Sequence, residues 1–91
     1  MDDEQTETTD KTEELLASIK QRALESLLPL VDSLEVAPER KFEILMTVVR
    51  SSNDPEMLNK ALLSAQQIEN QNAKTEALLD ILNETNFQLK S

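Results

Sequence analysis

Apolar residues recur every three or four positions along most of the chain, which is the spacing of amphipathic helices. The first such stretch predicts a helix over residues 12–34. The residues on its apolar face are Leu16, Ile19, Ala23, Leu27, Val31 and Leu34. Thr12 is the expected N-cap, and Glu13 and Glu14 would then lie near the positive end of the helix dipole.

Pro29 interrupts this first pattern. Inside a helix, proline lacks the amide that would bond to the carbonyl four residues earlier, here that of Glu25. The apolar phase nevertheless continues through Leu30 and Val31, so we expect one helix with a kink at Pro29. A break after Leu28, or a functional hinge, is the alternative.

A second helix is predicted over residues 38–51. Pro38 suits the first helical position, and it disfavours helical backbone at Ala37. At 100° per residue the apolar side chains cover an arc of about 200°, which is wider than contact with one neighbour requires. These side chains are Phe42, Ile44, Leu45, Met46, Val48 and Val49.

Two further helices are predicted over residues 54–70 and 73–86. Asp54 as N-cap and Pro55 as first helical residue start the earlier one, and Asn72 is the expected cap of the later one. Between them lies a polar strip, SAQQIENQNAK, without glycine or proline. We interpret it as a joint in which residues 70–72 turn the chain, because asparagine tolerates left-handed backbone. A binding site is the alternative interpretation.

The two halves of the chain share a weak internal repeat. With an offset of 34, identical residues fall at Leu24/Leu58, Leu28/Leu62, Glu35/Glu69 and Leu45/Leu79. The period resembles that of tetratricopeptide repeats, although this chain lacks their glycine and aromatic positions. A second resemblance is to helical-hairpin repeats in small uncharacterised bacterial all-helical proteins, which implies paired helices and no known activity. It is carried by Ala65, Ile68, Glu69, Lys74, Ala77 and Leu78.

These patterns together predict an all-α fold. We expect a four-helix domain built from two successive antiparallel helical hairpins, spanning residues 12–91 as a single domain. Residues 1–11 are acidic and threonine-rich without apolar periodicity, so they predict a disordered tail.

The composition argues against an enzyme. The chain has no His, Cys, Tyr or Gly, which removes the usual neutral-pH base, thiolate chemistry and glycine-dependent phosphate loops. We therefore predict no catalytic residues, no cofactor, no metal site and no small-molecule substrate. No run of about 20 apolar residues is present, and the N-terminus is acidic rather than signal-like, so no membrane contact and a cytoplasmic location are expected.

The net charge of −9 is concentrated near the N-terminus. Residues 1–14 carry −6 and the remaining residues carry −3. Because affinity for nucleic acid depends on neutralising phosphates, we do not expect DNA or RNA to bind. An acidic inhibitor, or a nucleic-acid-mimicking or antitoxin-like protein that binds a basic partner, is the alternative function.

The wide apolar arcs on the second and fourth helices favour a non-enzymatic protein-protein interaction module. Its partner would be another protein or a second copy in a homodimer. Ile44, Val48, Leu79 and Leu82 are the residues expected at or next to the contact surface. The alternative is that four helices in two layers use these arcs simply to cover one another.

Overall fold

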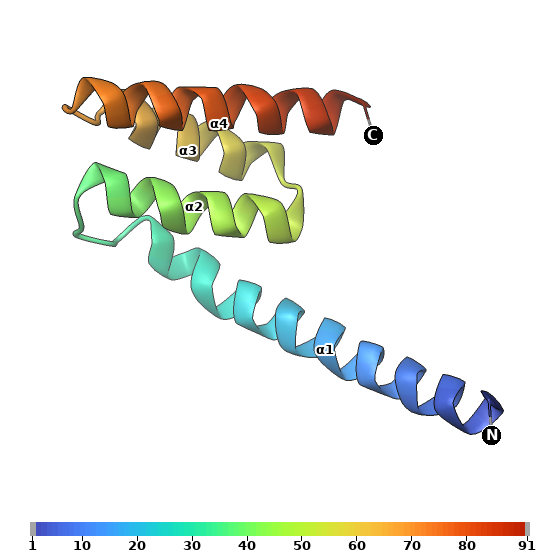
Figure 1. The fold of residues 1–91 in the computed structure, drawn as a ribbon. Coiled ribbons are helices and arrows are strands. Elements are labelled where there is room, and N and C mark those ends of the chain that lie inside the picture. The colour runs from blue at the N-terminus through green and yellow to red at the C-terminus, as the bar shows by residue number, and fades with distance from the viewer. Residues whose placement is uncertain (1, 91) are drawn as a thin grey trace. The chain divides into compact units, whose positions relative to one another are not determined.

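The computed structural model describes residues 2–90, with side chains from residue 11 onward, and contains four helices and no strand in that range. They are α1 (Asp2–Val31), α2 (Pro38–Ser52), α3 (Pro55–Gln66) and α4 (Gln71–Lys90) (Figure 1). The all-α, four-helix fold is therefore confirmed. The chain divides into two compact units, Met1–Asp32 and Ser33–Ser91.

The first unit consists of α1. The helix begins at Asp2 rather than at residue 12, so Thr12 lies inside it and is not its N-cap. Acidic residues close to a helix N-terminus stabilise the helix, because they interact with the positive end of its dipole. This interaction gives a physical reason for the earlier start. The side chains of residues 1–10 lie outside the described part, and the disorder of a tail over residues 1–11 stays a prediction. Pro29 lies within α1, which ends only at Val31, so the helix does not break after Leu28.

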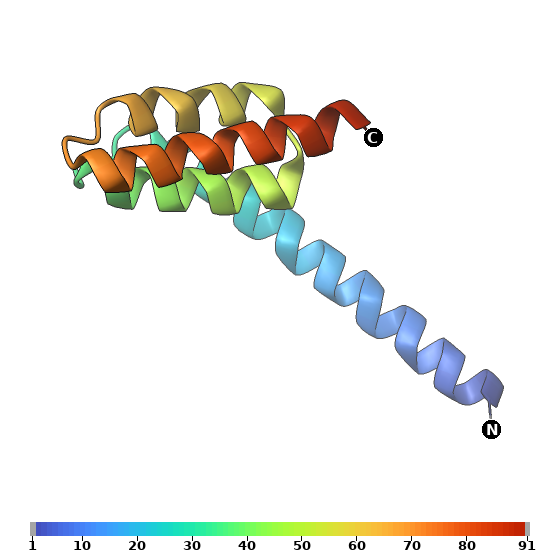
Figure 2. The same cartoon turned by 45° about the horizontal axis from the view of Figure 1, so that its top comes forward.

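The second unit contains α2, α3 and α4, each antiparallel to the one before it (Figure 1). α3 packs against both of its neighbours, and α4 also lies alongside α2, as the turned view shows (Figure 2). An ion pair joins these two helices, with the Arg50 Nε atom 3.9 Å from a carboxylate oxygen of Glu84. The predicted α3–α4 hairpin is therefore present, and α2 and α3 form another.

The core of this second unit is aliphatic, with one aromatic ring. α2 contributes its largest members, and α3 contributes two alanines that are fully buried, Ala61 and Ala65. Such small side chains allow the neighbouring helices to approach closely. The other buried apolar residues from Phe42 onward are Phe42, Leu45, Met46, Val48, Val49, Met57, Leu58, Ile68, Ala77 and Ile81.

Both proline-marked helix starts lie where the sequence predicts them. Ala37 is extended before Pro38, at φ −58° and ψ 150°. Asp54 caps α3, because its Oδ1 atom accepts a hydrogen bond of 3.0 Å from the amide of Glu56. These starts are local, since α2 depends on Pro38 alone, without a side-chain cap, and α3 on Pro55 with the Asp54 cap.

The helix ends differ from the prediction. α2 closes at Asn53, which adopts left-handed backbone at φ 56° and donates its amide to the carbonyl of Val49 over 2.7 Å. It is the one non-glycine residue with positive φ in the described chain, so the left-handed turn expected at residues 70–72 is wrong. Asn70, not Asn72, caps α4, since its Oδ1 accepts the amide of Ala73 at 2.9 Å.

The other boundaries shift by a few residues. α3 ends at Gln66 instead of residue 70, and α4 continues to Lys90 instead of ending at residue 86. The predicted pairing of the first two helices, and the single domain over residues 12–91, span the division between the units and stay predictions. Across the described residues, no helix is both long and apolar enough to cross a membrane.

Candidate interaction surfaces

The four residues predicted to lie at a contact surface have very different exposure. Leu79 and Leu82 on α4 are 52% and 55% exposed. Val48 on α2 is 1% exposed, and Ile44 is half-buried. Only the α4 pair is therefore available to a partner in this structure.

These two pairs do not form one surface. α2 faces α4 with the side that carries Glu43 and Arg50, and Ile44 and Val48 lie at least about 100° around the helix from these two residues. On α4, Leu82 lies about 160° around the helix from Asp80. Each pair thus points away from the boundary between α2 and α4.

Leu79 and Leu82 belong to a longer apolar ridge on α4. Leu89, seven residues after Leu82, lies on the same face and is 79% exposed. Leu78 is half-buried beside Leu82, toward the core side of the helix. We call Leu79, Leu82 and Leu89 the α4 ridge.

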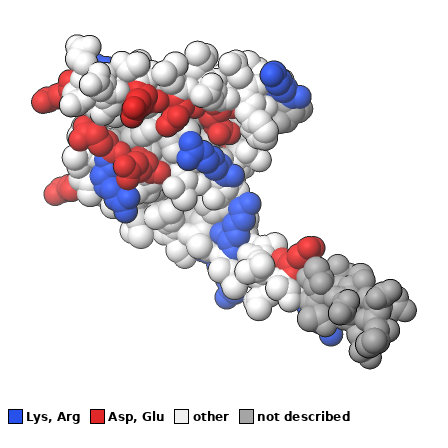
Figure 3. Space-filling view, in the orientation of Figure 1, with Lys and Arg blue, Asp and Glu red and all other residues white. Residues whose placement is uncertain are grey.

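A second surface feature is a shallow groove between α2 and α4, with a volume of about 210 Å³. Its floor is apolar, with Phe42, Ile68 and Ala77 nearly buried. Its rim is acidic, and Figure 3 shows carboxylates gathered over the facing sides of the two helices. The rim carboxylates are those of Glu39, Glu43, Glu76 and Asp80.

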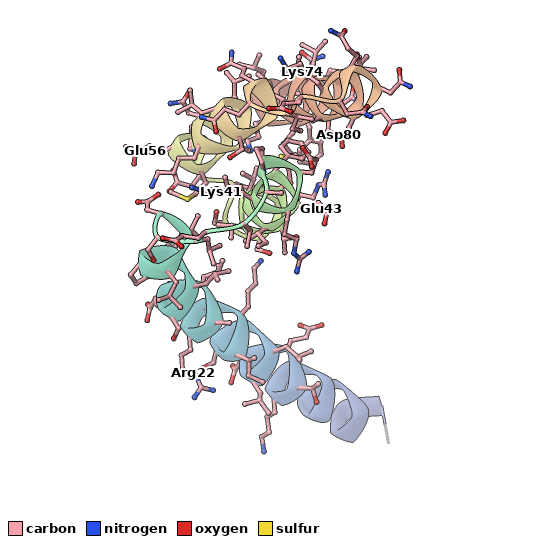
Figure 4. All side chains as sticks on the ribbon, turned by 90° about the vertical axis from the view of Figure 1, so that its left-hand side faces the viewer. Arg22, Lys41, Glu43, Glu56, Lys74 and Asp80 are labelled. Atoms are coloured by element: carbon pink, nitrogen blue, oxygen red, sulfur yellow. The ribbon has the colours of Figure 1, made fainter. Side chains whose placement is uncertain are left out.

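Figure 4 shows Glu43 and Asp80 on one side of the second unit and Glu56 on another. One rim carboxylate is partly neutralised, because Arg40 lies 3.2 Å from Glu43 on the same helix. We call this surface the acidic groove.

The polar strip contributes to a neighbouring hollow of about 470 Å³. Its residues Gln67, Glu69 and Asn70 line this hollow together with Pro38 and Glu39. Glu39 is shared with the acidic groove, so the α3–α4 joint extends the acidic surface by one more carboxylate.

The acidic groove was not predicted from the sequence, although the spacing of its carboxylates is a signal for it. Glu39 and Glu43 are four residues apart on α2, and Glu76 and Asp80 are four apart on α4. Like charges at this spacing destabilise a helix slightly, so helix formation does not account for them. What the sequence does not indicate is that these two pairs face the same groove.

Within residues 11–90 no group of three carboxylates is arranged to hold a metal ion. Over the same range, every buried side-chain nitrogen or oxygen has a hydrogen-bond partner.

Comparisons with known proteins returned no matching family model, no matching curated protein and no matching solved structure.

Proposed function

We propose that this protein is a non-enzymatic protein-binding module that docks a protein partner on the α4 ridge. The observation that carries the proposal is the exposure of Leu79 and Leu82, each above one half, beside the still more exposed Leu89. Three leucines along one side of a helix are the kind of surface that a partner groove or a second amphipathic helix covers.

The ridge is large enough to matter energetically. Full burial of a leucine side chain contributes about 1.5 to 3 kcal/mol, so covering side chains that are half exposed or more contributes on the order of 1 kcal/mol each. Three such residues correspond to roughly a hundredfold difference in affinity, at about 1.4 kcal/mol per factor of ten.

The test is affinity capture from the native host with three versions of the full chain. The double variant Leu79→Gln, Leu82→Gln is expected to lose a partner that the unmodified chain retains. Leu63→Gln is the matched control, because Leu63 on α3 is 51% exposed but lies outside the ridge. Equal recovery of every bound protein by the double variant and the unmodified chain, with helicity intact, would exclude the ridge.

The second candidate function is an acidic inhibitor or nucleic-acid mimic that binds a basic partner. The acidic groove supports it, because a lysine or arginine side chain could lay its methylenes on Phe42 and Ala77 and its charge beside the rim carboxylates. Such binding would weaken steeply with added salt.

Two variants distinguish this candidate from the first. Glu43→Gln, Asp80→Asn should release a basic partner, whereas the control Glu56→Gln removes a charge that lies elsewhere on the unit. Deleting residues 1–11 tests the N-terminal acids separately. A partner that stays bound at high salt, and that also binds the groove variant, would be assigned to the α4 ridge instead.

A further inference from the structure

The first unit carries an apolar stripe of its own. On α1, Leu15, Leu16 and Leu30 are 58%, 58% and 57% exposed, and Ile19 is 47% exposed. Leu16, Ile19, Ala23 and Leu30 fall within about 60° of one another around the helix, with Leu15 just beside them.

The side of α1 away from this stripe is mixed, because Leu24 and Leu28 lie there and are half-buried beside a narrower polar face. On the polar face Gln21 donates a hydrogen bond of 3.1 Å to Glu25. The Nε atom of Arg22 donates one of 3.4 Å to the carbonyl of Ser18 at the edge of the polar face, next to Leu15. The exposed apolar stripe extends over about 21 Å from Leu16 to Leu30 at 1.5 Å per residue.

We propose that two copies of this chain pair through the α1 stripe, with the two helices antiparallel. Residues 16, 19, 23, 26 and 30 alternate steps of three and four, which is the spacing of a helix-helix seam. Ala23 and Ser26 at the middle of the stripe are small, so two copies can approach closely there. The leucines and isoleucine toward the ends then pack around that crossing.

Charge selects the antiparallel arrangement. From Lys11 to Val31 the helix has three bases and three acids, so two copies of this part do not repel each other strongly. Residues 2–10 contain five acids and no base. Parallel pairing would place these two acidic segments side by side, whereas antiparallel pairing puts them at opposite ends.

This pairing goes beyond the proposed function, because it uses the first unit and leaves the α4 ridge free for a partner. Its failure would leave the proposal for the ridge unaffected. The reverse also holds, since a chain that binds no partner at the ridge could still dimerise through α1.

Sedimentation equilibrium of the full chain over a range of concentrations tests the pairing. The unmodified chain should show a monomer-dimer equilibrium. Leu16→Gln, Ile19→Gln should raise the dissociation constant by roughly a thousandfold, because four partly exposed apolar side chains per dimer, at about 1 kcal/mol each, are lost. The control Leu79→Gln, Leu82→Gln should leave it unchanged.

Three results would overturn the pairing: a strict monomer, an unchanged dimer in the α1 variant, or a dimer lost in the α4 control. If glutamine at positions 16 and 19 reduces helicity, Ala23→Glu replaces that variant. It retains a good helix former and places a like charge from each copy at the crossing. It should also weaken the dimer, and an unaffected dimer counts against the stripe.

Nitroxide labels on two single-cysteine variants test the orientation, since the chain has no cysteine of its own. In an antiparallel pair, labels at Lys20→Cys are close because position 20 lies beside the seam and near its middle. Labels at Lys11→Cys are then far apart, at opposite ends. Short distances at both positions would show a parallel pair and refute the antiparallel arrangement.

Discussion

Leu45 provides the sharpest test of the core of the second unit. This side chain on α2 is fully buried, with an exposed fraction of 0%. Replacing a buried leucine by alanine typically costs about 2 to 5 kcal/mol, because the transfer free energy is lost and a cavity remains. We expect Leu45→Ala to lower the free energy of unfolding by this amount.

The expected loss is large compared with the total stability. At about 0.05 to 0.15 kcal/mol per residue, a unit the size of Ser33–Ser91 has a free energy of unfolding of roughly 3 to 9 kcal/mol. Leu45→Ala should therefore lower the melting temperature by at least about 8 °C, at about 4 to 8 °C per kcal/mol for a small domain. A loss of about 5 kcal/mol would unfold the unit if its stability lies in the lower part of that range.

Thermal and urea unfolding followed by far-UV circular dichroism measures the effect. Leu63→Ala is the matched control, because Leu63 is 51% exposed and its truncation leaves no internal cavity. Leu63→Ala should lower the free energy of unfolding by less than about 1 kcal/mol. If Leu45→Ala were no more destabilising than Leu63→Ala, the packing of α2 described here would be wrong.

Three further predictions concern the helix ends and the groove. Asn53→Ala should lower the free energy of unfolding by about 1 kcal/mol, because alanine disfavours left-handed backbone, whereas Asn53→Gly should not lower it; urea titrations compare the two. Asn70→Ala should lower the free energy of unfolding by about 1 kcal/mol, and Asn72→Ala by less than about 0.5 kcal/mol. The reverse order would show that Asn72 is the cap of α4. Asp80→Asn should raise stability by about 0.2 to 0.5 kcal/mol at low salt by removing the repulsion from Glu76, with the gain shrinking as salt is added. Unchanged stability at every salt concentration would contradict that last expectation.

The two helix starts marked by proline could be predicted from the sequence far better than the other helix boundaries. Pro38 and Pro55 specify their starts through local backbone restrictions that no distant residue needs to support. The ends lack such a signal, because the chain has no glycine to mark them. Asn53 supplies the left-handed residue that glycine usually provides, and nothing in its neighbourhood distinguishes it from the asparagines of the later joint.

The interaction surfaces were only partly predictable. A wide apolar arc is compatible with contact to two neighbouring helices or with one neighbour and one free face. Val48 lies in the core, whereas Leu79 and Leu82 are exposed, although all three belong to arcs of similar width. Exposure depends on which sides of a helix its neighbours cover, and periodicity along the chain carries no information about that.

The length of α4 has a consequence for how a partner would bind. α4 has 20 residues, whereas the α3 helix beside it has 12, and its two buried residues, Ala77 and Ile81, both lie in the first part of the helix. The last turns, with Phe87 at 62% and Leu89 at 79% exposure, therefore have less core contact to hold them and should open more readily than the first turns. A ligand spanning Leu79 to Leu89 would contact both the first part of α4, which is packed against the core, and the last turns, which open more readily. Part of its binding energy would be used to order the C-terminal turns, so affinity would depend on helix propensity near Leu89 as well as on the leucines themselves.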